Sequence, residues 1–171
     1  NFMIDKLKYV TYQTFPADTA NSLQTISNIK YLIRNGVSVE LYFPLRSHES
    51  NDNLSILQNI YEVNEDFVVK GVKHPYPHGK ISYFPKLIFH LSHFLWARKT
   101  IKKSFKNNTT DYFFTRSDWI AYFLTKQGSK VAFECHQTSK LRTFILKKIH
   151  KYKNLKVIFL NDNLKSFYSF I

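Results

Sequence analysis

The chain has 171 residues, of which 44% are hydrophobic and 17% aromatic, with 25 Lys and Arg against 12 Asp and Glu. This composition suits one packed domain and excludes the disordered class. The single cysteine, Cys135, excludes an intrachain disulfide. No apolar run reaches the roughly 18–20 residues that a membrane-spanning helix needs.

The positive charge is concentrated in the second part of the chain. Residues 1–70 carry 6 Lys/Arg and 8 Asp/Glu, whereas residues 71–171 carry 19 Lys/Arg and 4 Asp/Glu. The formal net charge of the whole chain is +13. A one-sided positive field favours an anionic partner: phosphate groups, acidic glycans, anionic lipid or nucleic acid. The alternative is a general compositional bias, since Lys, Asn, Ile, Tyr and Phe are all abundant.

The first 43 residues predict a strand, a helix and a second strand. Residues 8–12 form a short β-prone run, and residues 21–34 place isoleucines on one helical face before Asn35-Gly36 closes the helix. Residues 37–43 form the second strand, and we expect Pro44 to end it because proline lacks a backbone N–H. This order opens a doubly wound parallel sheet.

The loop after the first predicted strand borders a helix start, where free backbone N–H groups favour anions. Asp18, Thr19 or Asn21 can cap that helix. The loop contains no glycine, so neither a G-x-G-x-x-G fingerprint nor a P-loop is present. The sequence therefore argues against a nicotinamide dehydrogenase or a P-loop NTPase.

The middle of the chain predicts a helix over residues 54–61, a strand over 67–72 and a loop over 73–80. His74 and His78 in that loop have the spacing of a metal-binding pair. No carboxylate or cysteine lies near them in the sequence, so we assign no metal site.

The longest predicted helix covers residues 83–106. Its most apolar stripe consists of Phe84, Leu87, Ile88, Leu91 and Leu95, and Lys and Arg crowd its last turns, where they oppose the helix dipole. The simplest interpretation is an amphipathic helix that packs this stripe on the sheet. The alternative is a basic, aromatic-rich surface that rests on an anionic membrane.

Residues 111–139 predict a strand, a helix and a strand, with Gly128 closing the helix. A helix between two strands implies a parallel pair, and ligands in such sheets bind outside the carboxyl ends of the strands. Arg116 follows the first of these strands, whereas Glu134 and His136 lie at the end of the second. Because side chains alternate along a strand, we expect Glu134 and His136 to point to one side.

The chain then predicts a basic helix over residues 140–152, a strand over 157–160 and the start of a helix over 164–171. The last helix carries no cap before Ile171. We therefore expect residues 1–171 to be a single domain cut from a longer protein.

Three segments together resemble family-4-type retaining glycosyltransferases of the GT-B fold. The first is YVTYQTFPADTANSLQTISNIKYLIRNGVSVELYFP, with Gly36, Val39 and Leu41 in a G-x-x-V-x-L-like second strand. The others are DYFFTRSDWIAYFLTKQGSKVAFECH and LKVIFLNDNLKSFY. The resemblance covers most of residues 8–171 and rests on segment order, the Thr-Arg-Ser turn and the Glu-x-His ending.

The resemblance implies an α/β, Rossmann-like, doubly wound and mostly parallel sheet with helices on both faces, one half of a GT-B fold. It implies that residues 1–171 are the acceptor-side domain, truncated before the C-terminal donor-binding domain. The implied enzyme moves a sugar from a nucleotide-sugar co-substrate to a glycan or lipid-linked acceptor, with no further cofactor and no metal. A cytoplasmic enzyme of glycan biosynthesis is implied, peripheral on the inner face of the membrane.

The resemblance also implies site residues. His136 matches a histidine that faces the sugar near the reaction centre, where imidazole can bond a hydroxyl or steady developing charge. Glu134 is expected to orient His136 or an acceptor hydroxyl, and Arg116 to contact an acidic group of the acceptor. Further acceptor contacts are expected from residues that border the first loop: Thr14, Thr19, Asn21 and Ser22.

Two other classes of function remain open at this point. One is a non-catalytic basic module that binds anionic lipid or nucleic acid, although no recognised nucleic-acid reader motif is present. The other is a nucleotide-sugar epimerase of the GT-B fold, because fold alone does not separate these enzymes.

Overall fold

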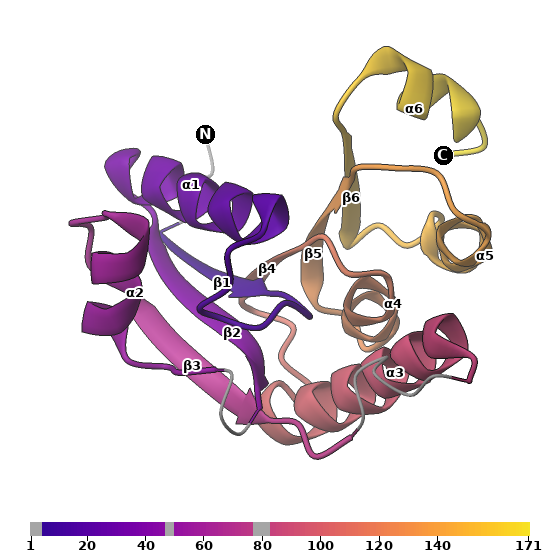
Figure 1. The fold of residues 1–171 in the computed structure, drawn as a ribbon. Helices are drawn as coiled ribbons and strands as arrows, with labels where there is room; N and C mark the ends of the chain where they lie inside the picture. The colour runs from indigo at the N-terminus through magenta and orange to yellow at the C-terminus, as the bar shows by residue number, and fades with distance from the viewer. Residues whose placement is uncertain (1–4, 47–49, 77–82) are drawn as a thin grey trace. The chain divides into compact units, whose positions relative to one another are not determined.

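The computed structural model describes residues 5–46, 50–76 and 83–171. The chain divides into two compact units, Asn1–Tyr76 and Pro77–Ile171. Figure 1 shows that strands and helices alternate along the chain in both units.

The first unit contains three strands and two helices. Its strands are β1 (Lys6–Val10), β2 (Ser38–Leu45) and β3 (Val68–Lys73), and its helices are α1 (Ala20–Arg34) and α2 (Leu54–Tyr61). β2 pairs in parallel with β1 on one side and with β3 on the other. The core of the unit combines buried strand residues with one face of α1, and its fully buried members include Tyr9, Leu41, Phe43 and Ile29.

The second unit repeats this plan with a further helix. Its strands are β4 (Tyr112–Thr115), β5 (Lys130–Cys135) and β6 (Leu155–Phe159), and β5 pairs in parallel with both neighbours. Its helices are α3 (Pro85–Ser104), α4 (Asp118–Lys126), α5 (Lys140–Ile149) and α6 (Asp162–Phe167). The described chain is thus α/β with parallel strands and flanking helices, which confirms the predicted Rossmann-like, doubly wound class.

Several predicted boundaries hold for clear local reasons. The cap of α1 is Thr19, whose side chain accepts a hydrogen bond from the backbone N–H of Ser22. Gly128 follows α4 at φ +95°, a conformation that glycine adopts without strain. Helix α2 spans the residues that the sequence predicts.

The prediction that Pro44 ends the second strand is wrong. Strand β2 continues to Leu45, and Pro44 is in register with Val72 of β3. The backbone of Tyr42 faces β1, since its carbonyl accepts from the N–H of Thr11, so two residues later Pro44 faces the same side. Strand β1 has already ended at Val10, and the N–H that proline lacks therefore has no ladder partner to lose.

The prediction that the apolar stripe of the long helix packs on the sheet is also wrong. The exposed fractions are 74% for Phe84, 65% for Leu87 and 54% for Leu91. The buried residues of α3 are instead Ser92, His93, Trp96, Ala97, Thr100 and Ile101. Helix α3 packs against α4, where the ring of Phe94 meets those of Trp119 and Phe123.

Glu40 on β2 links the three strands of the first unit. Its Oε1 lies 2.7 Å from Lys6 Nζ of β1, and its Oε2 accepts from the Tyr42 hydroxyl at 2.9 Å and lies 3.8 Å from Lys70 Nζ of β3. Burial on its own would raise the pKa of Glu40, but the bonds from Lys6 and Tyr42 outweigh burial and hold this pKa below its usual value.

The depressed pKa predicts how stability depends on pH. A carboxyl group whose pKa is lower in the folded state stabilises the fold above its unfolded pKa of about 4.3, and this stabilisation is lost as pH falls through the folded pKa. We expect Glu40→Gln to lower the urea midpoint at neutral pH and to reduce the loss of stability below pH ~4. Glu62→Gln, at an exposed position of the same unit, is the control. Parallel acid profiles for wild type and Glu40→Gln would contradict the assignment.

Candidate functional site

The carboxyl ends of β4 and β5 bring Arg116, Glu134 and His136 together. Arg116 directly follows Thr115, the last residue of β4, and His136 directly follows Cys135, the last residue of β5. Residues 133 and 135 of β5 are fully buried hydrophobic residues, so alternation sends Glu134 and His136 to the opposite side. The prediction that Glu134 and His136 point to one side is confirmed, because His136 Nε2 lies 2.7 Å from Glu134 Oε1.

Each ring nitrogen of His136 lies beside a charged side chain. Arg116 Nη2 lies 2.9 Å from His136 Nδ1, and because a guanidinium only donates, Nδ1 must accept. Nε2 is then the ring nitrogen that can donate. We call Arg116, Glu134 and His136 the His136 cluster.

One ring nitrogen of the His136 cluster is open to a further hydrogen bond. Nε2 is buried and makes no hydrogen bond to the described residues, although the Glu134 carboxylate lies 2.7 Å from it. The side chain of His136 keeps an exposed fraction of 17%, so a small ligand can approach it. A buried N–H without an aligned acceptor costs free energy that a ligand hydroxyl can recover.

A buried guanidinium fixes the backbone around the His136 cluster. Arg142 of α5 is 6% exposed, its Nε donates to Asp118 Oδ1 at 2.7 Å, and its Nη1 donates to the carbonyl of Gln137 at 2.9 Å. Its Nη2 reaches the carbonyl of Arg116 at 3.5 Å. Burial on its own would lower the pKa of Arg142, but the Asp118 carboxylate outweighs burial and raises it, so the guanidinium stays charged.

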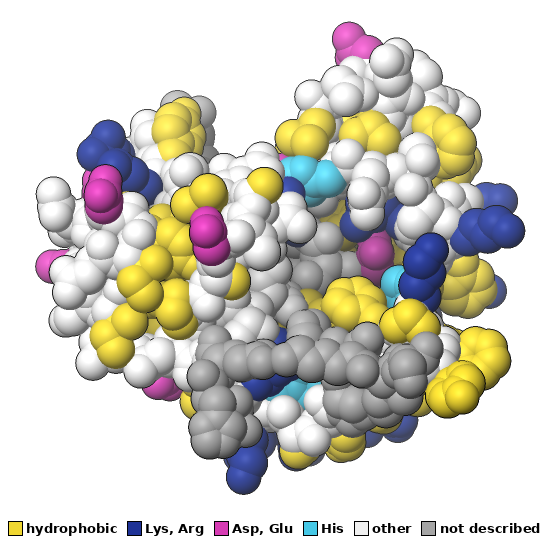
Figure 2. Space-filling model, in the orientation of Figure 1, with side chains coloured by type: hydrophobic (Ala, Val, Ile, Leu, Met, Phe, Trp, Pro, Cys, Tyr) yellow, Lys and Arg dark blue, Asp and Glu magenta, His cyan; other side chains and the backbone are white. Residues whose placement is uncertain are grey.

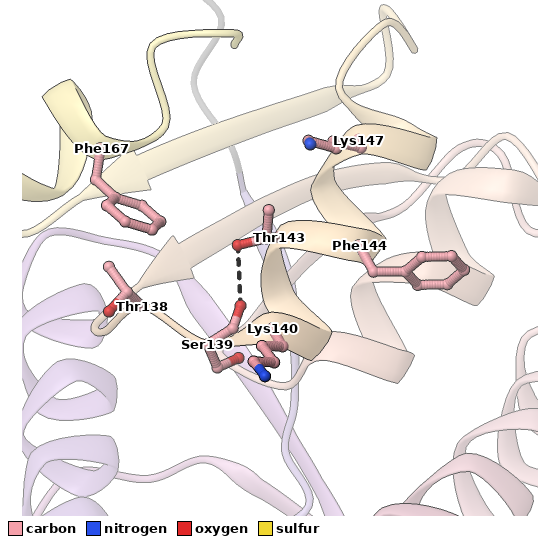
Figure 3. A pocket seen from close by; sticks show the side chains of 7 residues that line it. All are labelled: Thr138, Ser139, Lys140, Thr143, Phe144, Lys147 and Phe167. Carbon is pink, nitrogen blue, oxygen red and sulfur yellow. Dashed lines mark hydrogen bonds between the residues drawn. The ribbon is translucent and has the colours of Figure 1, made fainter.

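A groove of about 570 Å³ lies beside α5 and α6 (Figure 3). Its lining begins at Thr138, two residues after His136 in the sequence. Ser139 caps α5 by accepting from the backbone N–H of Arg142, and its carbonyl accepts from the Thr143 hydroxyl at 2.9 Å. Lys147 and Phe167 extend from α5 and α6 on either side of the groove in Figure 3. The full lining is Thr138, Ser139, Lys140, Thr143, Phe144, Lys147 and Phe167. Two ammonium groups, hydroxyls and two rings suit a sugar that carries an anionic group.

The other four predicted site residues lie in the first unit, at the loop after β1. Thr19 and Ser22 bond each other at the start of α1, with 2.8 Å between their hydroxyl oxygens. Thr14 accepts a hydrogen bond from the guanidinium of Arg46. Asn21 is exposed in the first turn of α1. Thr19 thus caps α1 and Ser22 bonds to it, and their predicted contact with an acceptor stays a prediction.

The sequence interpretation missed a second polar cluster, in the first unit. The Tyr12 hydroxyl lies 2.6 Å from His74 Nε2, and the guanidinium of Arg46, which is 8% exposed, lies 5.3 Å from the centre of the Tyr12 ring. Arg46 and His74 each directly follow a strand, β2 and β3. Their place at strand ends was the available signal, but the sequence alone did not pair them.

The structure offers no support for a metal pair at His74. His78 lies outside the described residues. Within the part of the chain that the structure describes, no three His, Cys, Asp or Glu side chains group as metal ligands.

Cys135 stands apart from the chemistry of the His136 cluster. Its side chain is fully buried, and burial raises the pKa of its thiol, which its neighbour Arg142 only partly offsets. Because neighbouring residues of a strand point to opposite faces, Cys135 and His136 form no thiol–imidazole pair.

Neither a scan against protein-family models nor a search of curated proteins gives a match for this sequence. Among the helices of the described residues, none combines the length and the apolar character needed to cross a bilayer.

Proposed function

We propose that this chain is the acceptor-side domain of a GT-B glycosyltransferase of the family-4 type. In the proposed reaction, the bond from the sugar C1 to the phosphate oxygen of a nucleotide-sugar breaks, and the nucleoside diphosphate leaves with the electron pair. A hydroxyl oxygen of the acceptor forms the new bond and releases its proton. Retention of configuration and independence from a metal follow from the resemblance of the sequence to that family.

The observation that carries the proposal is the position of His136 between Arg116 and Glu134. A sugar C1 gains positive character as the nucleotide leaves, and a carboxylate near the site favours that charge. Arg116 Nη2 lies 2.9 Å from His136 Nδ1, and the Glu134 carboxylate lies 2.7 Å from Nε2. A buried Nε2 that makes no hydrogen bond to the described residues suits a sugar hydroxyl near the reaction centre.

The groove beside α5 and α6 supplies a place for the acceptor. It begins at Thr138, two residues after His136, and Lys140 and Lys147 line it. Ammonium groups favour an acceptor with a phosphate or carboxylate, and the rings of Phe144 and Phe167 suit the apolar face of a sugar. The proposed roles are therefore His136 at the donor sugar, Glu134 as the residue that orients it, and Arg116 at an acidic group of the substrate.

The test is nucleoside diphosphate release by the protein at its natural full length. UDP-glucose, UDP-N-acetylglucosamine and GDP-mannose are incubated with wild type, with water in place of the acceptor hydroxyl, and the rate of nucleoside diphosphate release is followed by a coupled assay. We expect release from one of these donors, and we expect His136→Ala to lower kcat by roughly 10²-fold.

The matched control is His150→Ala. His150 is also a half-buried histidine of the second unit, but its Nδ1 bonds the carbonyl of Leu146 at the end of α5. We expect His150→Ala to keep the wild-type rate. Equal rates for His136→Ala and wild type would refute the role of His136. No release from any nucleotide-sugar would refute the transferase and favour a binding module.

A further inference from the structure

A buried histidine directly follows strand β3 and makes contacts through both nitrogens of its ring. His74 is 5% exposed, and Figure 2 shows histidine side chains as only small patches on the face that it draws. The backbone N–H of His74 donates to the carbonyl of Leu45, the last residue of β2, at 3.0 Å. Its ring Nε2 lies 2.6 Å from the Tyr12 hydroxyl, and its Nδ1 accepts from the backbone N–H of Tyr76 at 3.3 Å. We use the name His74 group for Tyr12, His74 and Tyr76.

The contact with Tyr76 requires a neutral His74 ring. A backbone N–H can only donate, so Nδ1 of His74 accepts and carries no proton. The ring proton is then on Nε2, which donates to the oxygen of the Tyr12 hydroxyl. A protonated imidazole carries a proton on both nitrogens and cannot accept from Tyr76. The hydrogen bond between Tyr76 and His74 is therefore lost when His74 takes up a proton.

A buried cation lies against the same tyrosine as the His74 ring. The centre of the Tyr12 ring is 5.4 Å from the centre of the His74 ring and 5.3 Å from the guanidinium of Arg46, which is 8% exposed. Other titratable or charged side chains lie on neighbouring parts of the first unit, on β3, after β3 and on the loop that bonds to β3: Lys73, Tyr76 and Asp52. Protonation in place would set two positive charges against one buried Tyr12 side chain, and burial opposes this. A proton on His74 therefore favours an open arrangement in which the ring reaches water.

We propose that the His74 group is a pH switch that holds the end of the first unit at neutral pH and releases it in acid. The first unit ends at Tyr76, so the bond from the Tyr76 N–H to His74 holds its last residue. An exposed histidine takes up a proton near pH ~6.5. The closed arrangement is thus favoured above that pH, and each pH unit below it makes the open arrangement about ten times more favourable. This inference does not depend on the proposed transferase activity.

The test is amide hydrogen exchange in the full-length protein, labelled with ¹⁵N-tyrosine and followed by NMR. The protection factor compares each amide with an unfolded chain at the same pH, which removes the intrinsic pH dependence of exchange. We expect the protection factor of the Tyr76 amide to fall about tenfold from pH ~6.5 to pH ~5.5. The Tyr9 amide, in fully buried strand β1 of the same unit, is the internal control and should keep its protection. An equal fall at Tyr9 would mean that the whole unit unfolds and would overturn the proposal.

The matched variant is His74→Asn, which keeps an acceptor but does not titrate. The side-chain oxygen of asparagine can accept from the backbone N–H two residues on, as in an Asx-turn. We expect the protection factor of the Tyr76 amide in His74→Asn to stay constant over this pH range. His150→Asn changes a half-buried histidine of the second unit and should keep the wild-type fall at Tyr76. Equal falls in wild type and His74→Asn, or constant protection in wild type, would refute the switch.

A measurement on the wild-type ring keeps the proposal testable if His74→Asn does not fold. The ¹⁵N chemical shifts of an imidazole show which ring nitrogen carries a proton. At pH ~7.5 we expect His74 to show a protonated Nε2 and an unprotonated Nδ1, as the contacts with Tyr12 and Tyr76 require. As the pH falls through about 6, we expect Nδ1 of His74 to become protonated while the Tyr76 amide signal shifts with it. A proton on Nδ1 at pH ~7.5, or a Tyr76 signal that does not follow the His74 ring, would overturn the proposal.

Discussion

Replacing Asp118 by alanine is expected to lower the free energy of unfolding by about 3–5 kcal/mol. The carboxylate holds two nitrogens of Arg142, with Nε at 2.7 Å from Oδ1 and Nη2 at 3.4 Å from Oδ2. The side chains of Arg142 and Asp118 are only 7% and 15% exposed. Without Asp118 the guanidinium stays buried without its counter-charge, and that penalty exceeds the loss of the pair itself. Urea unfolding followed by far-UV circular dichroism measures the change.

An exposed ion pair provides the control for Asp118→Ala. Arg34 and Glu65 lie at the same distance, 2.7 Å, but the Arg34 side chain is 63% exposed, so Glu65→Ala should change stability little. The double variant Asp118→Leu/Arg142→Met removes both buried charges, and we expect it to recover most of the lost stability. A loss no larger than that of Glu65→Ala would show that the Asp118–Arg142 pair contributes no more than a surface pair.

The same ion pair connects stability with the site. Arg142 bonds the carbonyl of Arg116 and that of Gln137, the residues that carry or directly follow the His136 cluster. Asp118 begins α4 and Arg142 belongs to α5, so the pair fixes the ends of β4 and β5 relative to the two helices that follow them. We infer that Arg142 and Asp118 position the His136 cluster, without contact to a substrate.

Local sequence signals were sufficient for most of the fold. Period-2 and period-3.6 patterns gave the order of strands and helices, and glycine and cap residues gave several of the ends. The prediction that Pro44 ends the second strand was wrong because it depends on the neighbouring strand in the tertiary structure. Whether a proline interrupts a sheet depends on the length of the neighbouring strand, and β1 ends before it reaches Pro44.

Part of the site could be predicted from the sequence, because it follows from the alternation of side chains along a strand and from the place where the strand ends. Glu134 and His136 lie two residues apart at the end of a strand, so their proximity needed no tertiary information. Arg142 was missed because the sequence places it among the basic residues of α5. Its burial depends on Asp118, which is 24 residues away in the sequence, and a helical pattern carries no information about such a partner.

The buried side of α3 could not be predicted from the periodicity of its hydrophobic residues. Both sides of this helix carry large apolar side chains, with Leu87 and Leu91 on one side and Trp96 and Ile101 on the other. A pattern that selects the more apolar stripe then selects the wrong side, because the fit of Trp96 and the ring contacts of Phe94 with α4 decide which side is buried. The free energies of unfolding of variants on the two sides of α3 show which side is buried.

Trp96→Ala is expected to lower the free energy of unfolding by about 3–5 kcal/mol, because Trp96 is 1% exposed and its removal leaves a large cavity. Leu91→Ala on the same helix should change it by no more than about 0.5 kcal/mol, since the Leu91 side chain is 54% exposed and alanine favours the helix. Urea unfolding of the two variants in the absence of lipid measures both values. The reverse order would mean that the apolar stripe is the buried face of α3. The expected order would show that packing against α4, and not the apolar character of a stripe, decides which side of this helix is buried.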